Sequence, residues 1–142
     1  MDYQAMVREF HEKYGHAIKE TPGIGVAPEL CFLRIRLMKE ELHELELAML
    51  HEDLGGVADN LADLAYVVFG TALTYGIPLD AAFAEVHRSN MTKLVPPAKA
   101  LHEKYPEGFN PKGPGYEPPD IAQVLYRAIT GAPQSTSEAS ET

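Results

Sequence analysis

Acidic side chains on two neighbouring stretches of the chain carry the strongest chemical signal. Glu40, Glu41 and Glu44 lie close together, and Asp63 follows 19 positions after Glu44 at the head of a stretch without charge until Asp80. An acid at the start of an apolar helix is costly to bury unless a counter-charge lies close by. A divalent cation held between two helices by these carboxylates would supply that charge.

The three glutamates interrupt the apolar side of a predicted helix over residues 29–51. At about 100° per residue they share about one third of that helix with four apolar side chains, those of Leu30, Leu33, Leu37 and Ala48. A solvated charge cluster is the alternative, and it fits less well because the acids interrupt an apolar stripe. Asp63 lies beyond the first turn of the next predicted helix, over residues 57–75, which is too deep for a capping residue.

The type of ligand indicates the type of cation. Ligands that are all oxygen favour hard cations, so Mg²⁺ is expected, with Mn²⁺ as its natural substitute. Zinc is disfavoured because the chain has no His-x-x-x-His pair, and the lone Glu40-x-x-His43 step lacks the second step of a di-iron bundle. Mg²⁺ also keeps positions open for phosphate oxygens, which would let a chain of net charge -9 bind an anion.

Hydrophobic spacing and helix breakers predict an all-α fold without any useful β-alternating run. The predicted helices cover residues 2–19, 29–51, 57–75 and 79–94, with short ones near 99–105 and 120–129. The stretch over residues 96–119 is rich in Pro and Gly, and most of it is expected to be irregular. We therefore expect one domain over residues 1–131, a four-helix bundle core with a Pro/Gly-rich extension and a short docking helix. Residues 132–142 are expected to form a disordered tail.

Composition limits the partners and the compartment. Twenty-one acidic against 12 basic side chains argue against a nucleic-acid partner. Cys31 has no second cysteine to pair with, and Asp2, Arg8 and Glu9 occupy positions where a signal peptide would be apolar. The uncharged run over residues 64–79 has 16 residues, short of the roughly 20 that span a bilayer. These features predict a cytoplasmic protein without a membrane segment.

Polar side chains on the fourth predicted helix form a further group. His87 and Asn90 lie on a mainly apolar stripe, where buried polar groups need partners. Asn90 is either a satisfied core amide or a ligand-binding group, and His87 is more simply a core or interface histidine. Lys93, one turn after Asn90, is either a surface lysine or a side chain that reaches a phosphate.

Taken together, these motifs resemble a known family. The runs Glu40-Glu41-Leu42-His43-Glu44 and Val86-His87-Arg88-Ser89-Asn90-Met91-Thr92-Lys93, with Asp63 between them, are similar to those of the all-α nucleoside triphosphate pyrophosphohydrolases. These are MazG-like proteins, related to dimeric dUTPases and phosphoribosyl-ATP pyrophosphohydrolase. The likeness covers about residues 29–94, and residues 112–120 are similar to the closing segment of some members.

The resemblance implies a bundle core of the MazG-like type and a set of metal ligands. The residues that match the Mg²⁺ ligands of the family are Glu40, Glu41, Glu44 and Asp63. Asn60 departs from the pattern, because it stands where the second motif has a glutamate. An amide oxygen ligates more weakly and without charge, so either Asp59 takes part or the number of metal ions differs.

The resemblance also implies the parts that would hold a substrate. Asn90 and Lys93 would face the phosphates, and the N-terminal helix and the loop after it would help to shape a pocket for the base. His11, Tyr14 and His16 are the candidates in that pocket.

The implied reaction is Mg²⁺-dependent hydrolysis of a nucleoside or deoxynucleoside triphosphate between the α- and β-phosphates, as in nucleotide-pool house-cleaning or a dUTPase. Glu40 would complete a second metal site or act as general base. A phosphoribosyl-ATP pyrophosphohydrolase and a non-catalytic, cation-binding helical module are the alternatives. Relatives are dimers or dimers of dimers, and the very apolar helix over residues 57–75 also favours a homo-oligomer.

Overall fold

The fold is all-α, as predicted. The computed structural model describes residues 2–93 and 110–132, and these residues contain helices and no strand. The helices are α1 (Tyr3–Tyr14), α2 (Pro28–Leu50), α3 (Leu54–Tyr75), α4 (Leu79–Met91) and α6 (Ile121–Thr130). The chain forms two compact units, Met1–Leu79 and Asp80–Thr142. The expected single domain over residues 1–131 stays a prediction.

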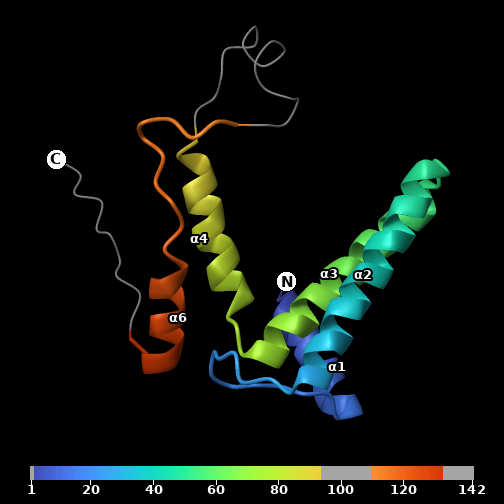
Figure 1. Cartoon of the computed structure of the whole chain (residues 1–142), viewed down its shortest axis with the longest axis horizontal. Coiled ribbons are helices and arrows are strands. Elements are labelled where there is room, and N and C mark those ends of the chain that lie inside the picture. The colour runs from blue at the N-terminus through green and yellow to red at the C-terminus, as the bar shows by residue number, and fades with distance from the viewer. Residues whose placement is uncertain (1, 94–109, 133–142) are drawn as a thin grey trace, which may run out of the picture. The chain divides into compact units, whose positions relative to one another are not determined.

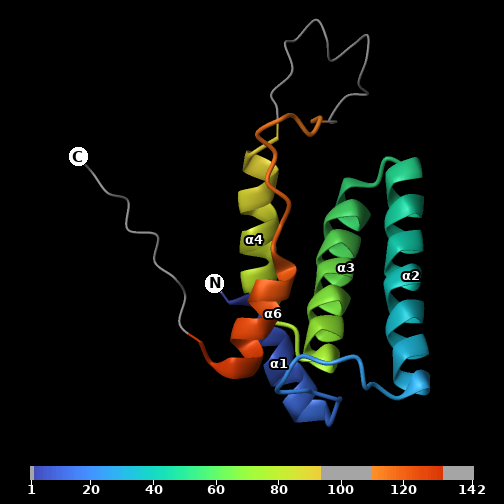
Figure 2. The ribbon, with the colours of Figure 1, turned by 60° about the vertical axis from the view of Figure 1, so that its left-hand side comes forward.

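Helices α2 and α3 form an antiparallel hairpin in the first unit, and the two ribbons lie side by side in Figures 1 and 2. Asp53 begins α3, because its carboxylate accepts a hydrogen bond from the backbone N–H of Gly56 at 3.1 Å. This cap draws Gly55 and Gly56 into the first turn, so the predicted start at residue 57 was three residues late. The tight turn places the last turns of α2 beside the first turns of α3.

Helix α1 packs against α3 and is shorter than predicted. Asp2 caps its start by accepting a hydrogen bond from the N–H of Ala5 at 2.9 Å. Gly15 ends it in the left-handed conformation at φ 69°, and its N–H donates to the carbonyl oxygen of His11. The prediction that this helix reaches residue 19 was therefore wrong, since the glycine stops it. Val7 on α1 and Leu73 on α3 are among the most buried apolar side chains.

The loop between α1 and α2 crosses the carboxyl end of α3. The N–H groups of Lys19 and Gly23 donate to the carbonyl oxygens of Leu73 and Tyr75, at 2.9 and 3.1 Å. Gly76 ends α3 at φ 69°, and a Cβ there would lie 2.7 Å from the carbonyl carbon of Thr21. Only glycine permits both this backbone conformation and this close approach. The loop therefore satisfies carbonyl groups that the end of α3 leaves open.

The second unit contains α4, the segment over residues 110–120 and α6. Helix α4 ends at Met91, three residues before its predicted end at residue 94. Asp120 caps α6 by accepting a hydrogen bond from the N–H of Gln123 at 2.9 Å, close to the predicted start of the docking helix. The helix predicted near residues 99–105 and positions 133–142 of the predicted tail lie outside the described residues.

Within the described part of the chain, no single helix is long and apolar enough to cross a membrane. Helices α3 and α4 meet that criterion only as a pair broken at the turn between them, and only by length and composition.

Candidate active site

A cavity of about 490 Å³ opens between the three helices of the first unit. It is lined from α1, α2, α3 and the loop after α1 by Phe10, His11, His16, Leu33, Arg34, Leu37, Glu41, Asp63, Tyr66 and Val67. The lining combines two carboxylates, one guanidinium, aromatic rings and apolar side chains. A few charged groups among apolar and aromatic walls are typical of a small-molecule site.

The acidic part of this cavity consists of Glu41 on α2 and Asp63 on α3. Burial raises the pKa of Glu41, and the negative charges of four neighbouring acids raise it further. In order of effect these neighbours are Asp63, Glu44, Glu40 and Asp59. The predicted metal-binding acids are therefore close enough to repel one another around Glu41. A cation beside Glu41 would remove this repulsion.

The donor set fits a hard divalent cation in its chemistry. All four predicted ligands offer carboxylate oxygens, and a cation beside Glu41 would offset the repulsion that raises its pKa. As they lie, no three His, Cys, Asp or Glu side chains of the described ranges converge on one point that could hold an ion. Glu40 points to Arg36, whose Nε lies 3.5 Å from its Oε1, and both side chains are exposed. Exposed side chains change rotamer within nanoseconds, so the carboxylate of Glu40 is able to leave Arg36.

Arg34 is a buried cation in the wall of the same cavity. Its side chain extends from α2 to α3, where Nη2 donates to the carbonyl oxygen of Val67 at 2.8 Å and Nε donates to Thr71 Oγ1 at 3.2 Å. The residue is 8% exposed, and this burial lowers the pKa of its guanidinium. No ion pair holds it among the residues that the structure describes. Its remaining N–H donors are available to a ligand in the cavity.

His11 lies beside Arg34 and is 3% exposed. Its Nδ1 lies 3.1 Å from the carbonyl oxygen of Ala17, which can only accept, so Nδ1 carries the proton. Burial lowers the pKa of His11, and the charge of Arg34 lowers it further. The ring is therefore neutral near pH 7, and Nε2 is left as an acceptor.

Aromatic rings form another part of the wall. Phe10 stacks on His16 with ring centres 5.5 Å apart, and it meets the edge of Tyr66 at 5.6 Å. Such planar surfaces suit the faces of a heterocyclic base. Of the three residues predicted for a base pocket, His11 and His16 line the cavity, whereas Tyr14 does not and instead packs on Phe10 at 4.7 Å.

The other predicted residues lie as follows. Asp59 is exposed and Asn60 is half-buried, both on α3. Asn90 and His87 are exposed and Lys93 is half-buried, and all three belong to the second unit. The predicted contact of Asn90 and Lys93 with phosphates stays a prediction.

Sequence reasoning did not select Arg34, Phe10 or Tyr66, although each carried a signal. Arg34 precedes Glu41 by two helical turns on the same side of α2, between Leu30 and Leu37. A cation at that spacing on an apolar stripe is unusual and needs a buried partner. Tyr66 follows Asp63 by three positions on α3 and shares its face.

Comparison with known proteins supports an enzymatic role. The family model described as phosphoribosyl-ATP pyrophosphohydrolase matches residues 7–90, which include Glu41, Asp63 and the whole cavity lining. An uncharacterized protein of Acanthamoeba polyphaga mimivirus is 35% identical over 82 residues, which are 56% of this chain and 32% of that protein. The chain thus spans about a third of that relative's length. The match covers more than half of the chain and therefore shows the family. The chain belongs to the phosphoribosyl-ATP pyrophosphohydrolase family, within the all-α pyrophosphohydrolases of the MazG-like type.

Proposed function

We propose that the chain hydrolyses a nucleoside or deoxynucleoside triphosphate between its α- and β-phosphates, releasing a nucleoside monophosphate and pyrophosphate. One observation carries this proposal: a single cavity is lined by the carboxylates Glu41 and Asp63 and also by stacking rings and Arg34. The carboxylates suit a cation that binds phosphates, and the rings suit a base. A nucleotide has both parts.

The proposed cofactor is Mg²⁺, with Mn²⁺ as a substitute. Glu41, Glu44 and Asp63 would hold it through their carboxylate oxygens. When bound there, Mg²⁺ would supply an activated water and would neutralise charge that develops on the departing pyrophosphate. Glu40 would take a proton from the attacking water or complete a second metal site, and its exposed ion pair with Arg36 leaves its carboxylate free to turn.

The base is proposed to pack against the faces that the rings of Phe10, His16 and Tyr66 present to the cavity. There the free donors of Arg34 and the acceptor nitrogen of His11 would read its edge. A guanidinium favours an edge with carbonyl oxygens or unprotonated ring nitrogens, since it offers donors only. Asn90 and Lys93 are proposed to contact the phosphates.

Phosphorus NMR on a panel of substrates tests the function. The full chain is mixed with Mg²⁺ and each common nucleoside triphosphate, deoxynucleoside triphosphate or phosphoribosyl-ATP. We expect signals of a monophosphate and pyrophosphate from at least one triphosphate. If phosphoribosyl-ATP is the only substrate that is hydrolysed, the substrate is phosphoribosyl-ATP and not a nucleoside triphosphate. No turnover of any substrate would favour a non-catalytic, cation-binding module.

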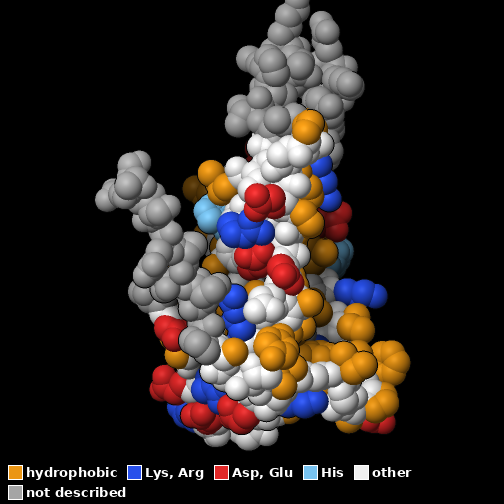
Figure 3. Space-filling view, turned by 90° about the vertical axis from the view of Figure 1, so that its left-hand side faces the viewer, with side chains coloured by type: hydrophobic (Ala, Val, Ile, Leu, Met, Phe, Trp, Pro, Cys, Tyr) orange, Lys and Arg blue, Asp and Glu red, His pale blue; other side chains and the backbone are white. Residues whose placement is uncertain are grey.

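We propose that the active form is a homodimer or a dimer of dimers. Apolar side chains reach the surface of the molecule, as the face in Figure 3 shows. A groove of about 420 Å³ in α2 is lined by Leu42, Leu45, Glu46, Met49 and Leu50, four of them apolar. Leu54 and Leu61 on α3 are also more than half exposed. So much exposed apolar surface is typical of a subunit interface.

Light scattering measures the assembly directly. At micromolar concentration, we expect a particle mass at least twice the 15.6 kDa of the chain. Replacing Leu50, which is 72% exposed, by Glu should shift the population toward the monomer, because a charge would enter the apolar interface. Gln123 on α6 is exposed and polar, so Gln123→Glu is the matched control and should leave the mass unchanged. A monomer as the sole species of the unmodified chain would contradict the proposal.

A further inference from the structure

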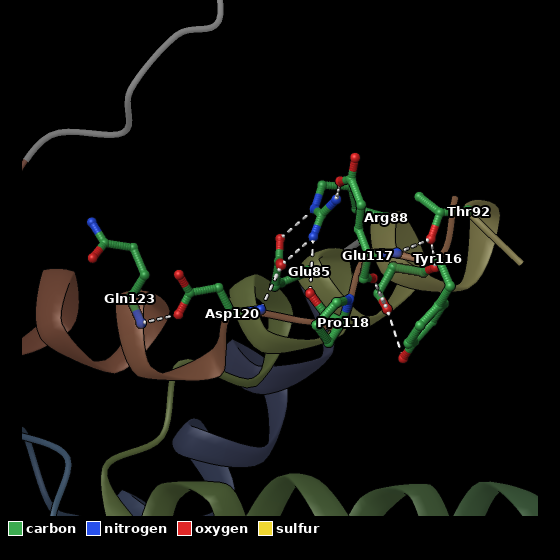
Figure 4. Close-up of polar contacts among 9 residues, drawn as sticks. Glu85, Arg88, Thr92, Tyr116, Glu117, Pro118, Asp120 and Gln123 are labelled. Carbon is green, nitrogen blue, oxygen red and sulfur yellow. Dashed lines mark hydrogen bonds and ion pairs between the residues drawn. The ribbon is translucent and has the colours of Figure 1, made fainter. Parts of the chain in front are cut away.

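In the second unit, the segment over residues 110–120 is clamped onto α4 by an ionic network. Arg88 lies at its centre, with Nη2 2.9 Å from Glu85 on α4 and Nη1 2.6 Å from Glu117 of the segment. Arg88 also donates to the carbonyl oxygen of Pro118 at 3.3 Å. Figure 4 shows these side chains pointing toward one another. The hydrogen bonds from Arg88 lower the pKa of Glu85 to about 2, so Glu85 stays ionised at neutral pH.

A second set of hydrogen bonds fixes the same segment one turn further along α4. Ser89, which is 1% exposed, donates from Oγ to the carbonyl oxygen of Glu117 at 2.8 Å. Thr92 Oγ1 accepts from the N–H of Glu117 at 2.9 Å. Both polar backbone groups of Glu117 are thereby bound to α4. The position of the neighbouring Tyr116 is consequently fixed, and its hydroxyl lies 3.3 Å from Ser89 Oγ.

Lys112 lies over the ring of Tyr116, and Lys93 lies within electrostatic range of the same tyrosine. Lys112 Nζ lies 4.7 Å from the centre of the Tyr116 ring, and both Lys112 and Lys93 are close enough to act electrostatically on its hydroxyl. Within the described ranges, neither lysine forms an ion pair with a carboxylate. In a chain of net charge -9, two cations without carboxylate partners around one hydroxyl make a local positive site.

We propose that Lys112 and Tyr116 form, together with Lys93, a binding site for a polyphosphate anion. Two ammonium groups and a phenolic hydroxyl offer donors and charge to an anion with several oxygens, which pyrophosphate and the phosphate chain of a nucleotide both have. Lys93 and the segment lie beyond the part of the chain that matches the family. The choice of a polyphosphate rests on the proposed function, since pyrophosphate is its product. The segment acts as a positioning element that supplies two phosphate-binding side chains.

Calorimetric titration of the full chain with inorganic pyrophosphate tests the site. EDTA is present, so that binding through a metal at the carboxylates does not contribute. Lys112→Ala should weaken binding roughly tenfold, because one charge-assisted contact is lost. Tyr116→Phe should weaken it about threefold, because a neutral hydrogen bond is lost. Lys13→Ala is the matched control, since Lys13 Nζ also lies over a tyrosine ring, that of Tyr14 at 5.3 Å, but in the other unit. It should leave the affinity unchanged.

The outcomes distinguish a failure of the proposed anion site from a failure of the proposed reaction. Pyrophosphate binding that does not weaken in Lys112→Ala relative to Lys13→Ala would overturn the site, as would no binding to the unmodified chain at millimolar pyrophosphate. Lys112 is exposed, so its removal should leave the thermal unfolding curve unchanged and a lost affinity would not reflect unfolding. If no triphosphate is hydrolysed but pyrophosphate binding still depends on Lys112, the proposed reaction fails and the site stands.

Discussion

Glu41→Gln should abolish Mg²⁺-dependent turnover while the helical circular dichroism signal stays that of the unmodified chain. Glu41 lines the cavity, and the charges of four neighbouring acids act on it. Removing a side chain that only orients a metal ligand costs about 10- to 100-fold in affinity or activity, so removing a direct ligand should cost more than about a hundredfold. Steady-state rates over a range of Mg²⁺ concentrations measure the loss.

The same variant distinguishes a metal ligand from a structural carboxylate. In EDTA, we expect Glu41→Gln to unfold at the same temperature as the unmodified chain or a higher one, because the amide removes repulsion from the neighbouring acids. Glu29→Gln is the control on the same helix, where Glu29 is exposed and lies outside both the cavity and the groove. It should keep full activity. Full activity in Glu41→Gln would refute the role of Glu41, and a large drop in its unfolding temperature would indicate a structural role instead.

Gly70→Ala should destabilise the first unit and impair catalysis together. A Cβ at position 70 would collide with Nη2 of Arg34 and lie 2.9 Å from Nε2 of His11, both buried. Arg34 would have to give up its hydrogen bond to the carbonyl oxygen of Val67, and such a bond from a charged group is worth about 1.5 to 3 kcal/mol. The better helix propensity of alanine offsets about 1 kcal/mol. The expected net loss in free energy of unfolding is about 0.5 to 2 kcal/mol.

Chemical denaturation and initial rates check this prediction. KM should rise as well, because the displaced guanidinium belongs to the proposed base pocket. Gly55→Ala is the control on the same helix, since its Cβ would meet only Asp53 Oδ1 at 3.5 Å, an ordinary contact. That change should leave stability unchanged or raise it. Equal stability and equal KM in both variants would show that the close approach of Arg34 to α3 contributes neither to stability nor to substrate binding.

The helices could be predicted because each depends on local signals. Apolar spacing identified the long elements, and their boundaries were off mainly where a single cap decides the end. Asp53 accepts a hydrogen bond from the N–H of Gly56, so α3 starts before its predicted first residue. Gly15 adopts the left-handed conformation, so α1 ends before its predicted last residue. Gly55 and Gly56 favour a break in the helix by their type, but the carboxylate of Asp53 stabilises them inside its first turn. Capping chemistry therefore decided the boundaries that periodicity missed.

The acidic half of the candidate site could also be predicted, whereas the rest depends on distant partners. Glu41 and Asp63 interrupt apolar stripes, which is visible along one helix at a time. Arg34 lies on the same helix as the glutamates, but its hydrogen-bond partners Val67 and Thr71 lie on another helix. Contacts between elements far apart in sequence leave no periodic signal. Likewise, the irregular segment after α4 was predicted, but its attachment through Arg88 and Glu117 was not.

The position of bond cleavage tests the central claim most directly. The full chain hydrolyses its best triphosphate with Mg²⁺ in water enriched in oxygen-18, and phosphorus NMR locates the label by its isotope shift. Attack of water at the α-phosphorus places the label in the nucleoside monophosphate and leaves the pyrophosphate unlabelled, which is the result we predict. Label in the pyrophosphate, or release of orthophosphate, would contradict the proposed hydrolysis.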